Sequence, residues 1–294
     1  MIRPLVVFSV IVLSTSRLCA GGDTVQTSPS GVTFLPGRLF FTPLAADPQE
    51  PRVGVRKEIG SSRLKLDIGS AIDLVGYAAE AGWQVRLGVD FFTYALTTSA
   101  EGLRLQVDAV DGYFGGHVAW GETPDGRGFR SRFRILHVSG HLIDGHWDRG
   151  AKQWKDNKEP IPYTRDFGEL LGSYGWRCGV VAVDVYTGLA YATLVRPDDL
   201  ARWSSLHGAL IRTTGLIGPV FGKEFALYAA DHLAVTGIPT YYATNTVESG
   251  VKFGPWDGTG IRMYVTYTSG LEPFSQYYDV RRDQWGLGIA FDFW

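Results

Sequence analysis

The sequence predicts an all-β fold, an antiparallel transmembrane β-barrel of about twelve strands that follows an amino-terminal signal peptide. Apolar and polar residues alternate with a period of two along most of the chain, which is the pattern of strands. The alternating segments run to ~10 residues or more, near the ~9–11 with which a tilted strand crosses a bilayer. Aromatic residues make up 13% of the chain, and many lie near strand ends, as in the interfacial girdles of membrane barrels.

The composition excludes two other classes of protein. Of the 294 residues, 45% are hydrophobic and 20% are charged, so the chain is not intrinsically disordered. Lys and Arg number 28 and Asp and Glu number 30, and the net charge of −2 gives no global attraction to a polyanion. We therefore expect no nucleic-acid partner.

The first twenty residues have the pattern of a secretory signal peptide, removed after Ala20. Arg3 is followed by an apolar run over residues 5–13, and cleavage before Cys19 as a lipoprotein is the alternative. Residues 21–50 contain four prolines and are expected to form an extended periplasmic leader, and residues 51–294 are expected to form the barrel. Cys178 is then the only cysteine, and a secreted chain without a disulfide is typical of a bacterial envelope. We expect the outer membrane of a Gram-negative bacterium.

Each strand is expected from its own alternating segment. In residues 82–97, for example, Trp83, Val85 and Leu87 share one parity, whereas Gln84 and Arg86 share the other. The twelve expected ranges are 52–58, 62–76, 82–97, 103–119, 128–140, 162–175, 178–195, 203–214, 223–235, 240–253, 259–269 and 283–294. The links at 141–161 and 270–282 are long and those at 176–177 and 254–258 are short, which is the outer-membrane pattern and puts both termini on the periplasmic side.

The polar residues of each strand lie on one face, and we expect this face to line the lumen. Arg130, Arg132 and Arg134 form a row on one face of a single strand. Twelve strands make a narrow barrel, so we expect these charges to pair and fill it. Their expected partners are Asp90, Asp108, Asp184 and Glu169. The alternative is a small anion-selective channel, in which Arg86, Arg104 and Arg262 would also line the bore.

His137 and Ser139 share the parity of Phe133 and Ile135, which is the side expected to face lipid. Side chains at i and i+2 of a strand lie ~6.5–7 Å apart at Cα, so a histidine can activate a neighbouring serine. Ser139 would attack an acyl ester, His137 would be the general base, and Thr164 or Asp166 would orient the imidazole. Backbone N–H groups near Gly140 or a bound cation would stabilise the oxyanion. The alternative is that both are ordinary polar residues at the membrane edge.

The link after this strand carries four potential metal ligands within eight residues, namely His141, Asp144, His146 and Asp148. Imidazole and carboxylate groups bind divalent ions. Their spacing matches no defined site, and the alternative is an ordinary polar extracellular loop.

Several segments resemble a bacterial family known as domain of unknown function 1207, whose members are considered outer-membrane proteins. They are FLPGRLFFTPLAADPQEPRVGV at 34–55, FRILHVSGHLIDG at 133–145, FGELLGSYG at 167–175, VDVYTGLAYA at 183–192 and SGLEPFSQYYDVRRDQWGLGIAFDF at 269–293. The resemblance implies a barrel and no particular activity. The last strand also resembles the carboxy-terminal strand that the outer-membrane assembly machinery reads, which implies that machinery as a partner.

The His137–Val138–Ser139 segment resembles outer-membrane phospholipase A, a family of twelve-stranded barrels with a lipid-facing His-x-Ser pair and an Asn on the next strand. The corresponding strand here offers Thr164 and Asp166 instead of that Asn. This resemblance implies an outer-leaflet lipid acyl hydrolase of the phospholipase A or lipid A deacylase type, with membrane lipids as partners and Ca²⁺ as a cofactor. We otherwise expect no cofactor.

The leading expectation is an integral outer-membrane barrel of unassigned activity. The serine-type hydrolase and the anion channel are the alternatives, and a soluble secreted β-sandwich is the more remote one.

Overall fold

The computed structural model describes residues 30–80, 82–100, 104–122 and 128–294. The expected signal peptide at 1–20 and the first part of the leader, residues 21–29, lie outside these ranges. The side chains of residues 99, 100 and 104 are likewise outside the description, so the expected lumen position of Arg104 falls there too.

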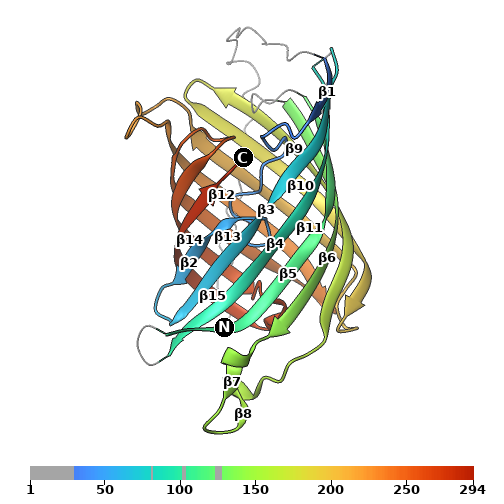
Figure 1. Ribbon diagram of the computed structural model, residues 1–294, viewed down its shortest axis with the longest axis vertical. Coiled ribbons are helices and arrows are strands. Elements are labelled where there is room, and N and C mark those ends of the chain that lie inside the picture. Colours follow the sequence, from blue (N-terminus) through green and yellow to red (C-terminus); the bar gives the residue numbers. More distant parts are fainter. Residues whose placement is uncertain (1–29, 81, 101–103, 123–127) are drawn as a thin grey trace.

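The chain forms a closed antiparallel barrel of twelve strands, in which the first strand of the wall, β2, pairs with the last, β15 (Figure 1). Every expected strand is present, with ends that differ by a few residues. The wall strands are β2 (Val53–Glu58), β3 (Arg63–Ala78), β4 (Gln84–Ala100), β5 (Arg104–Gly121), β6 (Gly128–Leu142), β9 (Tyr163–Cys178), β10 (Val181–Arg196), β11 (Trp203–Thr213), β12 (Phe225–Ile238), β13 (Thr240–Phe253), β14 (Gly260–Leu271) and β15 (Arg281–Asp292).

The remaining elements are short. β1 (Gly31–Phe34) pairs with the end of β3, and β7 (Trp147–Asp148) pairs with β8 (Gln153–Trp154) in a small hairpin. The 3₁₀ helices are η1 (Asp144–His146), η2 (Lys155–Asn157) and η3 (Ser275–Tyr277). None of the helices in the described ranges is long and apolar enough to cross a membrane.

The barrel presents apolar side chains outward and polar side chains inward, the reverse of a water-soluble protein. Along β15, Trp285 and Leu287 are more than half exposed, whereas Asp292 is buried in the lumen. Among the large outward residues of other strands, Phe91 is 73% exposed and Ile135 is 61% exposed. Such an apolar surface belongs in hydrocarbon, because water would penalise it at roughly 25 cal/mol per Å². The architecture is therefore that of an outer-membrane β-barrel.

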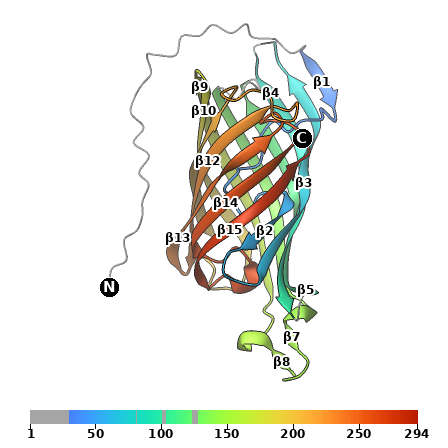
Figure 2. The ribbon, with the colours of Figure 1, turned by 90° about the vertical axis from the view of Figure 1, so that its left-hand side faces the viewer.

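The longest link, residues 143–162, projects from one end of the barrel, and the C-terminus lies toward the other end (Figure 2). The link 272–280 lies at the same end as 143–162, as expected. Two links depart from the expected alternation. Residues 214–224 form a long link at the C-terminal end, and β12 joins β13 through Pro239 alone.

The arginine row of β6 lies inside the barrel and is neutralised there. Arg130 pairs with Asp184 at 2.8 Å, and Arg134 pairs with Glu169 at 2.8 Å. Arg132 also pairs with Glu169, at 3.1 Å. The prediction that Glu169 and Asp184 pair with this row is confirmed.

The other two expected partners are engaged elsewhere. Asp90 accepts a 2.7 Å hydrogen bond from His117, which also binds Asp73 at 2.9 Å. Asp108 lies 3.8 Å from Lys155 and 3.9 Å from His146. The prediction that Asp90 and Asp108 pair with the arginine row is wrong, because histidine and lysine side chains lie closer to them.

Residues 39–52 lie inside the lumen and are called the plug below (Figure 1). The prediction that the leader is periplasmic is therefore wrong over residues 39–50. The Glu50 carboxylate accepts hydrogen bonds of 2.9 and 2.5 Å from Arg132. Arg52 pairs with Glu248 at 3.3 Å. The backbone N–H of Phe40 donates to Asp73 at 2.9 Å. The plug enters the lumen because its charges complement those of the wall, which no exposed position would offer.

The plug lies between β1 and β2, which pair with the same edge of β3, and it loops inward from that edge into the lumen. β1 pairs with residues 75–78 of β3, and β2 pairs with residues 64–67 on the same edge. The intervening residues 35–52 leave the wall and return to it. Where they leave, Leu39 packs against Ala71 and the last residue, Trp294. The plug is thus tied to the wall at both of its ends.

Candidate functional site

The predicted catalytic residues lie together on the outer face of two neighbouring strands. The register of β6 and β9 sets His137 opposite Asp166, and Ser139 opposite Thr164. All four side chains point outward, because they share the parity of the exposed Ile135. They lie near the ends of these strands from which residues 143–162 project. The site therefore occupies the edge of the apolar surface.

The imidazole of His137 is held by two neighbours. Its Nδ1 lies 2.5 Å from Asp166 Oδ1, and an ionised carboxylate can only accept, so Nδ1–H donates. The ring of Phe114 on β5 packs against the imidazole at a centroid distance of 4.7 Å. The His137 side chain is 33% exposed and that of Asp166 is 43% exposed. This hydrogen bond fixes the tautomer in which Nε2 is the free, basic nitrogen.

Ser139 lies next to His137 on the same face, and the two side chains form no hydrogen bond with each other within the described structure. A hydrogen bond between nucleophile and base often forms only with substrate in place. Gly112 is the register partner of Ser139 on β5, and a Cβ added there would lie 3.9 Å from the Ser139 hydroxyl. The missing side chain leaves one flank of Ser139 open.

Of the two residues expected to orient His137, the structure selects Asp166. The hydroxyl of Thr164 donates to the backbone carbonyl of Val138 at 3.1 Å. It is therefore satisfied within the sheet and does not bind the imidazole.

The expected oxyanion donor near Gly140 lies within the sheet. Gly140 is paired with Asp111 on one side and Tyr163 on the other, and its carbonyl accepts a 2.8 Å hydrogen bond from Gln276. The phospholipase resemblance implies calcium as a cofactor. The described residues contain no cluster of three or more His, Cys, Asp or Glu side chains, and Asp166 is hydrogen-bonded to His137.

The four loop residues expected to bind a metal are not brought together. His146 is buried, and its Nε2 binds the carbonyl of Lys155 at 2.9 Å. Asp148 caps a turn by accepting from the N–H groups of Gly150 and Ala151 at 2.8 and 3.0 Å. His141 and Asp144 are exposed. The prediction of a metal site here is wrong, because each polar group is satisfied locally or by solvent.

A second outward serine–histidine pair was missed by the sequence analysis. On β11, Ser205 Oγ lies 3.2 Å from His207 Nε2, and His207 Nδ1 lies 2.9 Å from Thr187 Oγ1 on β10. The signal that could have found it is the same i, i+2 spacing in the order Ser-x-His. Its third member is a hydroxyl, which cannot stabilise an imidazolium as a carboxylate does.

No protein-family model and no curated protein matches the chain. Several solved structures are similar in fold. The β-domain of the Bordetella autotransporter BrkA aligns with a TM-score of 0.47 and 12% identity, covering 82% of this chain and 96% of that chain. OmpT, an outer-membrane protein of Vibrio cholerae, aligns with a TM-score of 0.36 and 12% identity, covering 82% and 94%. A bacterial polysaccharide outer-membrane secretin aligns with a TM-score of 0.35 and 9% identity, covering 83% and 97%.

Proposed function

We propose that this protein is an outer-membrane acyl hydrolase in which Ser139, His137 and Asp166 cleave lipid acyl esters. The observation that carries the proposal is the 2.5 Å contact between His137 Nδ1 and Asp166 Oδ1, beside a serine on the same lipid-facing surface. A histidine and a carboxylate facing lipid are costly to desolvate, and such residues commonly have a function.

The chemistry follows from the roles of the three groups. Ser139 Oγ attacks the carbonyl carbon of the ester while its proton passes to His137 Nε2. The Asp166 carboxylate stabilises the imidazolium through Nδ1–H. The tetrahedral intermediate then collapses, the C–O bond to the lipid alcohol breaks, and that alcohol takes the proton from Nε2. Water hydrolyses the acyl-serine by the same route and releases a fatty acid.

The position of the site supports a lipid substrate. Ile135 lies two residues before His137 along β6, and Phe91 of β4 lies across the sheet, in register with the Phe114 that packs on His137. Both are largely exposed, so acyl chains would contact these apolar side chains. His137 and Asp166 lie where the surface becomes polar, which is the depth of ester groups in a leaflet. The polar links at this end suit the outer leaflet.

The test is the release of fatty acid from phosphatidylethanolamine vesicles and, in a separate arm, from lipid A, by detergent-refolded protein with and without calcium. Wild-type protein is expected to deacylate at least one substrate. Ser139→Ala is expected to reduce the rate to background, because it removes the nucleophile. Heat-modifiable mobility on gels verifies that each variant is a folded barrel.

Ser205→Ala is the matched control, since Ser205 is also an outward serine beside a histidine. It is expected to retain activity. Loss of activity in Ser205→Ala with none in Ser139→Ala would move the site to β11 and overturn the assignment. A folded wild-type barrel that is inactive on both lipids would reject the hydrolase.

The anion channel is less well supported. The arginines that would select anions are paired with Glu50, Glu169 and Asp184, and the plug lies among them. The resemblance to the domain of unknown function 1207 family stays a prediction and is compatible with the hydrolase.

A further inference from the structure

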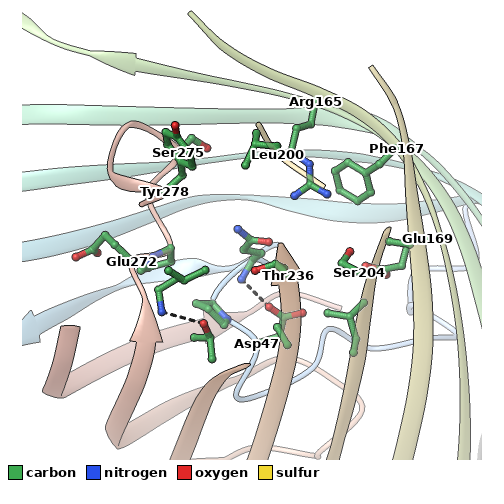
Figure 3. A pocket seen from close by; sticks show the side chains of 18 of the residues that line it. Asp47, Arg165, Phe167, Glu169, Leu200, Ser204, Thr236, Glu272, Ser275 and Tyr278 are labelled. Carbon is green, nitrogen blue, oxygen red and sulfur yellow. Dashed lines mark hydrogen bonds between the residues drawn. The ribbon is translucent and has the colours of Figure 1, made fainter. Parts of the chain in front are cut away.

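A cavity of about 120 Å³ lies in the lumen between the plug and the barrel end from which residues 143–162 project (Figure 3). Asp47 and Gln49 of the plug form its floor. Leu200, Ile238 and Tyr278 lie at its other side, in or next to the links at this end. We call this cavity the vestibule. It is separate from the site of His137 and Asp166 on the outer face. The vestibule residues of β9, such as Arg165, alternate with outward residues such as Asp166 and therefore face the lumen.

The cationic side chain of Arg165 lines the vestibule without an anionic partner. Figure 3 shows its guanidinium beside the ring of Phe167, and the distance to that ring centroid is 5.4 Å. Arg165 forms no ion pair with any residue in the described ranges. Its buried Nε atom has no hydrogen-bond acceptor. A buried donor without an acceptor is destabilising, and a bound acceptor would remove that penalty.

The other charged groups around the cavity are already compensated. Arg134 pairs with Glu169 at 2.8 Å, and Glu272 pairs with Arg63 at 2.9 Å. Asp47 accepts a 2.8 Å hydrogen bond from the N–H of Gln49. Of the arginines that line the cavity in the described part of the chain, Arg165 is therefore the one without a carboxylate partner. The carboxylates lining the same cavity would repel a ligand with several negative charges. The electrostatics favour a monoanion.

The remaining lining is suited to a ligand whose body is apolar. Tyr113, Tyr163, Phe167 and Leu200 surround the guanidinium side of the cavity. Burial and the nearby carboxylate of Asp199 raise the pKa of Tyr278 to about 12, so this residue is an uncharged hydroxyl at neutral pH. A dry cavity of roughly 150 Å³ holds a benzene-sized molecule, so the volume here suits a compact one.

We infer that the vestibule binds a small organic monocarboxylate, with its carboxylate on the guanidinium of Arg165 and its apolar body against Phe167, Tyr163 and Leu200. A carboxylate matches the planar donor geometry of a guanidinium, and the aromatic walls exclude water around the pair. This inference does not depend on the hydrolase.

Isothermal titration of the refolded full-length barrel with benzoate tests the inference. Wild-type protein is expected to show saturable one-site binding at millimolar concentrations or below. Arg165→Gln is expected to weaken binding roughly ten- to hundredfold, because it removes a charge-assisted hydrogen bond. Arg196→Gln is the matched control, since Arg196 is an exposed arginine at the same barrel end that pairs with Asp198. It is expected to bind like the wild type.

Three further probes make the outcome specific. Benzyl alcohol and inorganic phosphate are expected to bind at least tenfold more weakly than benzoate, since one lacks the charge and the other lacks the apolar body. Ala234→Leu, which fills the vestibule without changing its charge, is expected to abolish binding.

Absence of saturable benzoate binding by the folded wild-type protein would overturn the inference. So would equal binding of benzyl alcohol, or unchanged benzoate affinity in folded Arg165→Gln or Ala234→Leu. Tighter binding of phosphate would replace the proposed ligand class.

Discussion

In the proposed hydrolase, Asp166 is the residue that would distinguish a general base at His137 from an ordinary polar residue at the membrane edge. Its carboxylate is half-exposed, so the contact with His137 contributes little to the stability of the barrel. Its contribution would be to catalysis, where it fixes the tautomer and stabilises the imidazolium.

Asp166→Asn is therefore expected to lower kcat by about two to four orders of magnitude with little change in unfolding, by analogy with the loss of the acid in other triads. Fatty-acid release over a pH series measures the effect. Thr164→Val is the matched neighbour and is expected to change kcat by less than about threefold, because its hydroxyl binds Val138. Equal kcat for Asp166→Asn and wild type would remove Asp166 from the mechanism.

The strand pattern alone could place His137 and Ser139 on the outer face, because parity decides which face a side chain occupies. It could not select Asp166 over Thr164. That choice depends on the register between β6 and β9, which are separated in sequence by the link 143–162. A slip of one residue would set Arg165 opposite His137. The pair Ser205 and His207 was not predicted, because the resemblance to outer-membrane phospholipase A covers only the order His-x-Ser and residues 205–207 read Ser-Leu-His.

At the scale of elements, the plug determines the charge and the free space of the lumen. Glu50 is 1% exposed and is shared by Arg132 and Arg134, so one plug residue compensates two wall cations. Without the plug, these arginines would face an emptied bore. The plug thus occupies space in the lumen and neutralises two of its arginines.

Deletion of residues 39–50 is expected to raise conductance in planar bilayers and to make it anion-selective, since Arg132 and Arg134 lose Glu50. Glu50→Gln in the full-length chain removes the charge of Glu50 while the plug still fills the lumen, so it separates the effect of charge from the effect of volume. It is expected to leave conductance low and to reduce stability by about 3–5 kcal/mol, as when one partner of a buried ion pair is removed. A folded deletion variant that does not conduct would show that wall side chains alone close the lumen.

The strands could be predicted almost completely from the sequence, whereas the plug could not. Alternation is a local property, and each wall strand carries its own signal. The plug has no periodic pattern, and its three charged residues, Asp47, Glu50 and Arg52, indicate exposure until their partners on β12, β6 and β13 are known. Its prolines correctly indicated an irregular segment, but they carry no information on which side of the wall it lies.

At the scale of the whole molecule, the two ends of the barrel differ, and the exposed Cys178 marks one of them. Cys178 is exposed at the turn between β9 and β10, at the end opposite the link 143–162. If the long links face outward from the cell, this turn faces the periplasm.

An impermeant maleimide is therefore expected to leave Cys178 unlabelled in intact cells and to label it once the outer membrane is permeabilised. Asp148→Cys in a Cys178→Ser background is the matched control on the other end, and it is expected to react in intact cells. Labelling in the reverse order would invert the barrel and place the proposed hydrolase in the inner leaflet.

The tethering of the plug at both ends also sets how the molecule would respond to mechanical force. A pull on the amino-terminal side of β1 acts first on its four residue pairs with β3, from Gly31 with Ala78 to Phe34 with Val75. Only after this short ladder unzips does tension reach the contacts of Asp47 and Glu50. The pairing of β1 with β3 therefore bears the load first, and the plug keeps its contacts in the lumen until this pairing is broken.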